Sequence, residues 1–77
     1  MNDKKNFSIE KTFALAIQNH QKNNLQIAEK FYKEILEINS NHFGSIFYLG
    51  TLLAQTKKLD LAKPLLLKAT SYISWRK

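Results

Sequence analysis

The side chains that could carry out acid–base or metal chemistry are few and scattered along this sequence. The two histidines, His20 and His42, are separated by a predicted helix and a turn, which is not the spacing of metal ligands. Six acidic residues are spread along the chain without forming a convincing acid–base pair. Gly44 and Gly50 are the two glycines of the sequence, so it contains no glycine-rich phosphate-binding loop. We therefore expect no catalytic residue, metal site or cofactor, and predict that this chain alone is not an enzyme.

Length and composition limit the classes of protein to which this chain can belong. The chain has 77 residues, enough for one small domain, and contains no cysteine. The longest early apolar run, residues 13–17, is too short for a signal peptide or a membrane span. We therefore expect a cytoplasmic protein without a membrane span, with its stability supplied by helix packing, self-association or further chain.

The net charge of +6 is unevenly distributed. Residues 1–40 carry six lysines and five acidic residues, whereas residues 41–77 carry six basic residues against Asp60 alone. Such asymmetry is found in proteins that bind acidic partners, nucleic acid or anionic lipid, but a solvated lysine-rich face would produce it as well. On the second segment, Glu29 and Lys33 have the spacing of a helical ion pair.

Apolar residues recur with helical spacing in four segments separated by short polar stretches. The predicted helices cover residues 9–22, residues 25–41 including a polar ending at 39–41, residues 43–55, and a fourth segment from residue 59 to about 72. We expect residues 1–8, which are polar and unpatterned, to form a disordered lead-in. Segment 43–55 is apolar around most of its circumference, which predicts neighbours on several sides.

Individual residues predict how these helices begin, end and pack. Ser8 is a predicted N-cap, and Asn23 suits a left-handed turn. The 39–41 segment ends the second helix and offers caps for the third. Gly50 predicts a close approach of the second or fourth helix. Pro64 predicts a late start or a mild kink in the fourth helix, with Asp60 as its cap.

Similar residues also recur at a period of 34, which is typical of helical repeat arrays. The echoed positions are Leu15-Ala16 with Leu49-Gly50, Leu25 with Leu59, Ala28 with Ala62, Tyr32 with Leu66, and Ile35 with Ala69. This pattern resembles the tetratricopeptide (TPR) repeat family, with repeats at residues 9–42 and 43–76, the second carrying an apolar and basic tail. Thr12, Asn19, Ser40, Thr70 and Ser74 depart from the family's preferences. The resemblance implies an all-α, TPR-like α-α superhelix of four antiparallel helices.

TPR resemblance also implies a scaffold for protein–protein interaction, with a concave groove lined by the first helix of each repeat. The corresponding groove residues are Phe13, Ile17, His20, Gln21, Phe47, Thr51, Ala54 and Gln55. The lysines and asparagines with which one TPR subclass clamps a C-terminal carboxylate are missing, so no such ligand is expected. An apolar groove indicates a hydrophobic peptide, a partner helix or another copy of the chain. Alternatively, Phe13, Ile17 and Phe47 pack against one another.

Three further interpretations remain open. Two repeats would leave the last helix uncovered, so we expect the chain to self-associate, for example as a homodimer. The residues predicted for this contact are Leu65, Tyr72, Ile73 and Trp75. The chain could be the N-terminal TPR fragment of a larger enzyme, such as a bacterial TPR-glycosyltransferase or TPR-sulfotransferase. A weak nucleic-acid or lipid binder, acting through the basic second half, is the least favoured interpretation; we do not expect nucleic acid as the main partner.

Overall fold

The fold consists of four helices joined by short turns. A computed structural model describes the backbone of residues 8–73 and the side chains of residues 8–71. The helices are α1 (Ile9–Gln21), α2 (Leu25–Ile38), α3 (Phe43–Gln55) and α4 (Leu59–Ile73). The described residues contain no strand, so the predicted all-α class is confirmed. The predicted boundaries are also close, although α1 ends one residue earlier than expected.

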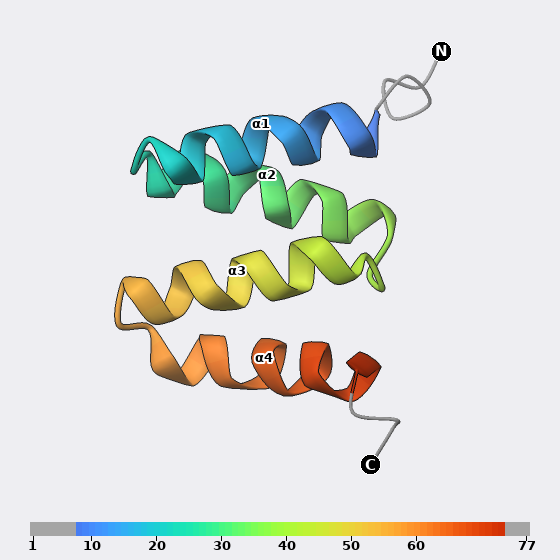
Figure 1. Cartoon of the computed structure of the whole chain (residues 1–77), viewed down its shortest axis with the longest axis vertical. Coiled ribbons are helices and arrows are strands. Elements are labelled where there is room, and N and C mark those ends of the chain that lie inside the picture. Colours follow the sequence, from blue (N-terminus) through green and yellow to red (C-terminus); the bar gives the residue numbers. More distant parts are fainter. Residues whose placement is uncertain (1–7, 74–77) are drawn as a thin grey trace.

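Successive helices run in opposite directions and lie in a row, in the order α1, α2, α3, α4 (Figure 1). Each helix packs on the next one along the chain, and the contacts within the pairs α1–α2 and α3–α4 are the most extensive. This arrangement is compatible with a helical repeat. It also places α3 between α2 and α4, which explains why a helix without one charged residue is stable there.

Local side-chain chemistry sets the helix ends. The Ser8 hydroxyl accepts a hydrogen bond from the Lys11 backbone N–H at 3.1 Å, which confirms the predicted N-cap of α1. Asn23 has a φ of 68°, the predicted left-handed turn conformation. The prediction that residues 39–41 would cap α3 is wrong. The cap is His42, whose Nδ1 accepts the Ser45 N–H at 3.1 Å, an imidazole role that common N-cap preferences do not suggest.

Of the two alternatives predicted from Pro64, a late start or a mild kink in the fourth helix, the late start is wrong. The Lys58 carbonyl already accepts hydrogen bonds from the N–H groups of Leu61 and Ala62, so α4 begins at Leu59, and Asp60 lies in its first turn. Pro64 therefore lies inside the helix. Its missing N–H leaves only the carbonyl one turn earlier, at the exposed Asp60, without a helical partner. Solvent can satisfy that carbonyl, and the helix continues to Ile73.

Small residues allow the helices to approach closely. Ala16, Ala28 and Ala62 are almost completely buried in the central apolar cluster, together with Tyr32 and Leu52. At Gly50 a Cβ atom would lie 2.8 Å from Leu66 Cδ2, too close for two carbon atoms. The predicted close approach at Gly50 is therefore confirmed, and the helix involved is α4.

Candidate binding groove between α1 and α3

The two helices that begin the predicted repeats enclose a shallow hollow. Its volume is about 260 Å³, and it is lined by Ile17, His20 and Gln21 of α1 and by Tyr48, Thr51 and Gln55 of α3. Five of these six residues belong to the set predicted from the sequence. Tyr48 was not predicted. Its neighbours in α3 are also apolar, so periodicity alone does not distinguish the side on which its ring lies.

The other three predicted groove residues do not line this hollow. The half-buried Phe13 points inward, with its ring edge-on to His42 at a centroid distance of 4.9 Å and tilted against Tyr48 at 5.8 Å. Phe13 thus packs inside the protein, although against His42 and Tyr48 and not against Ile17 and Phe47 as the alternative prediction had it. Phe47 is 43% exposed and contacts Tyr48 edge-on. Ala54 borders a separate hollow beside α4.

His20 joins three helices at the wall of the groove. Its Nδ1 lies 3.0 Å from the Tyr32 hydroxyl on α2, and its Nε2 lies 2.6 Å from Gln55 Oε1 on α3. An amide oxygen can only accept, so Nε2 carries a proton, and in the neutral imidazole Nδ1 then accepts the hydroxyl hydrogen of Tyr32. Both ring nitrogens are thus engaged in holding the groove together. His20 is thus a partly buried residue at the edge of the groove.

The tyrosine beneath His20 is strongly constrained. Tyr32 is fully buried, and its ring is nearly parallel to that of Tyr48, with centroids 6.2 Å apart. Burial, with a further contribution from Tyr48, raises the pKa of Tyr32 to about 12. Its hydroxyl therefore stays protonated at ordinary pH and can donate to His20. The groove floor is a neutral aromatic layer.

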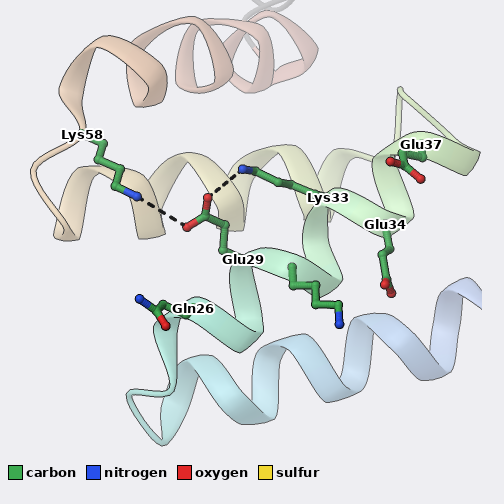
Figure 2. A pocket seen from close by; sticks show the side chains of 7 residues that line it. Gln26, Glu29, Lys33, Glu34, Glu37 and Lys58 are labelled. Carbon is green, nitrogen blue, oxygen red and sulfur yellow. Dashed lines mark ion pairs between the residues drawn. The ribbon is translucent and has the colours of Figure 1, made fainter.

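A second, larger hollow runs along α2. It has a volume of about 500 Å³ and is lined by Gln26, Glu29, Lys30, Lys33, Glu34, Glu37 and Lys58. Glu29 lies 2.8 Å from Lys33 and 3.9 Å from Lys58, as Figure 2 shows, which confirms the predicted ion pair. Charges of both signs partly neutralise one another here. Such a surface is typical of a solvated helix face, where each exposed pair stabilises little.

The residues predicted for self-association are only partly described. Leu65 is half-buried against α3, with its Cβ 3.3 Å from the position a Gly50 Cβ would occupy, so it does not lie on the outer face of α4. The side chains of Tyr72 and Ile73, and all of Trp75, lie outside the described residues. Among the α4 side chains that the structure describes, the exposed large apolar ones are Leu59, Leu61 and Leu67.

The two hollows present apolar surface and hydrogen-bonding side chains to a ligand. In the part of the chain that the structure describes, no group of three His, Cys, Asp or Glu side chains could hold a metal ion. Across the same residues, no helix is both long and apolar enough to cross a membrane. Comparison with family models, with curated proteins and with solved structures found no match.

Proposed function

We propose that this chain is a TPR-like scaffold of two helix-turn-helix repeats that binds a peptide or partner helix between α1 and α3. The observation that carries the proposal is the hollow of about 260 Å³ whose walls come from these two helices. The repeat interpretation is supported by the helix positions, because α1 and α3 begin and end 34 residues apart, and α2 and α4 begin 34 residues apart.

The lining determines the chemistry of the ligand. None of the six lining residues carries a permanent charge, and His20 is held by hydrogen bonds within the protein. Ile17 and Tyr48 offer apolar surface, while the amides of Gln21 and Gln55 lie at the two sides. This combination suits an uncharged apolar segment with a few hydrogen-bonding groups. A carboxylate ligand would find no lysine or arginine in the hollow.

A matched pair of variants tests this proposal. Peptides would be selected from a random display library against the whole chain, and their Kd measured by calorimetry. Gln21→Glu places a charge at the exposed edge of the groove, and we expect it to weaken binding about tenfold, because the charge must be desolvated by an apolar ligand. Gln26→Glu is the control: it makes the same change at an exposed position on α2.

The outcome is decided by comparing the two variants. Since both residues are exposed and helical, neither change should alter the fold, which circular dichroism can verify. Selected peptides that bind both variants with equal affinity would refute the groove as the binding site. Backbone amide shifts that cluster on α2 and α4, and not on α1 and α3, would lead to the same conclusion.

A further inference from the structure

A third hollow lies on α4, beside the end of α3. It has a volume of about 310 Å³ and is lined by Ala54, Leu59, Asp60, Ala62, Lys63 and Leu66. Leu59 at its edge is 63% exposed, whereas Ala62 within it is buried against the rest of the protein. The hollow thus has a buried residue, Ala62, at its base and an exposed apolar residue, Leu59, at its edge.

The 34-residue step shows what occupies the equivalent place in the first helix pair. The residues that lie 34 positions before the lining residues are His20, Leu25, Gln26, Ala28, Glu29 and Tyr32. Part of that place is covered by α3, because the Tyr48 ring stacks on Tyr32, with centroids 6.2 Å apart, and Gln55 binds His20, whereas Gln26 and Glu29 line the open hollow along α2. The α4 hollow is therefore the counterpart of the seat that α3 fills on α1 and α2.

We propose that this hollow on α4 is a docking site for an amphipathic helix of another protein. The helix would insert one large apolar side chain where Tyr48 sits in the first pair, and would present an acidic side chain to Lys63. This surface is separate from the groove between α1 and α3, since the two hollows share no lining residue.

The lining explains why the inserted side chain is apolar. In the first pair, the seat of Tyr48 includes Phe13 and two polar residues, His20 and Tyr32, which are joined by a hydrogen bond of 3.0 Å. Their counterparts on the α4 side are Ala54 and Leu66. These two residues have no polar side-chain atom, so a buried hydroxyl would lack a partner there. Phenylalanine or leucine fits better than tyrosine.

Charge specifies the second feature of the partner. Glu29 in the first pair binds Lys58, which follows α3 by three residues, at 3.9 Å. The counterpart of Glu29 on α4 is Lys63, of opposite sign. Among the described residues, Lys63 makes no ion pair. A docked helix that repeats the geometry of α3 would therefore place an acidic residue, in the position of Lys58, near Lys63.

A second copy of this chain fits the hollow poorly. If its α1 packed on α4 as α3 packs on α2, the counterparts of Tyr48 and Lys58 would be Ala14 and Asn24. Neither is large and apolar or acidic. Each copy also carries a net charge of +6, which opposes pairing. A foreign acidic helix meets both requirements.

A synthetic peptide built on α3 tests the proposal. The probe copies residues 42–58, with Tyr48→Phe for the inserted side chain and Lys58→Glu for the charge. A lactam bridge between Lys and Asp introduced at positions 47 and 51 holds it helical, since short helices are marginal alone. Labelled with fluorescein and used at nanomolar concentration, it is titrated with the full chain, and binding is followed by anisotropy.

Two variants should weaken binding and two should not. Leu59→Asp should weaken it at least about tenfold, since it charges the exposed edge of the hollow. Lys63→Glu should weaken it by about two- to fivefold, as for an exposed ion pair, and a probe that keeps Lys58 should restore affinity to that variant. The controls, Leu61→Asp and Lys68→Glu, change exposed α4 residues outside the hollow and should stay within about twofold.

Three results would overturn the proposal. One is the absence of saturable binding to the chain at up to about 1 mM, a concentration at which even weak helix docking is detectable. Another is equal affinity for Leu59→Asp and for its control Leu61→Asp. The third is sedimentation showing that the chain dimerises and that Leu59→Asp breaks the dimer, because the face would then belong to a second copy.

Discussion

Gly50 is the position at which two energetic effects compete most directly. It lies in the interior of α3, where alanine would favour the helix by about 1 kcal/mol. Against this, an added Cβ would lie 2.8 Å from Leu66 Cδ2, 3.0 Å from Leu66 Cγ and 3.3 Å from Leu65 Cβ. Overpacking of this kind costs about 1–3 kcal/mol. We therefore expect Gly50→Ala to destabilise the protein by up to about 2 kcal/mol.

The clash has a defined source, so it can be removed. Leu66→Ala deletes the two closest atoms and leaves only the 3.3 Å contact with Leu65, which a small shift can relieve. Leu66 is half-buried, and its truncation alone should cost about 1–2 kcal/mol, below the range for fully buried leucines. In that background, Gly50→Ala should be neutral or stabilising by up to about 1 kcal/mol.

Urea unfolding followed by circular dichroism at 222 nm measures all four proteins of this double-mutant cycle. The prediction is a change of sign: Gly50→Ala lowers the free energy of unfolding in the native background and does not lower it in the Leu66→Ala background. If Gly50→Ala stabilises both backgrounds equally, the approach of α4 is not the reason for the glycine, and the packing argument fails.

The remaining predictions concern single groups. Because the pKa of Tyr32 is raised to about 12, an unfolded chain loses this proton first, so stability should fall between about pH 10 and pH 12 by up to about 2–3 kcal/mol; Tyr32→Phe should flatten that decline in urea titrations. Lys57→Gly should stabilise by about 0.5–1 kcal/mol, since Lys57 has a φ of 65°; a lower melting temperature would contradict this. Ser8→Ala should cost about 1 kcal/mol, and faster amide exchange at Lys11 should locate the loss in the first turn of α1.

Helical periodicity explains why most of the fold could be predicted. Apolar spacing and the polar turns mark the helices, and Asn23 tolerates the left-handed conformation that its turn requires. The starts of α3 and α4 could not be predicted, because they depend on hydrogen-bond partners that the apolar spacing does not identify. His42 caps α3 with an imidazole nitrogen, and the Lys58 carbonyl starts α4 before Asp60. Hydrogen bonds of this kind are visible only in the folded arrangement.

The groove was predicted less completely, for a physical reason. Phe13 has the spacing of a groove residue, but its ring turns inward because Gly44 leaves room for it: a Cβ there would lie 2.5 Å from Phe13 Cζ. Gly44 belongs to another helix, so only the helix crossing reveals this relation. The engagement of His20 with Tyr32 and Gln55 is likewise non-local.

The uncharged sequence of α3 has a consequence for how the chain is made. All thirteen residues of this helix lack a charge, and its buried side chains, Ile46, Leu49 and Leu52 among them, are hidden only when both neighbouring helices are present. During synthesis, α3 leaves the ribosome before α4, so its apolar surface is transiently open to other chains. A chain truncated after Gln55 should therefore aggregate instead of forming a smaller domain. Packing of α4 on α3 thus protects the apolar surface of α3 from contact with other chains.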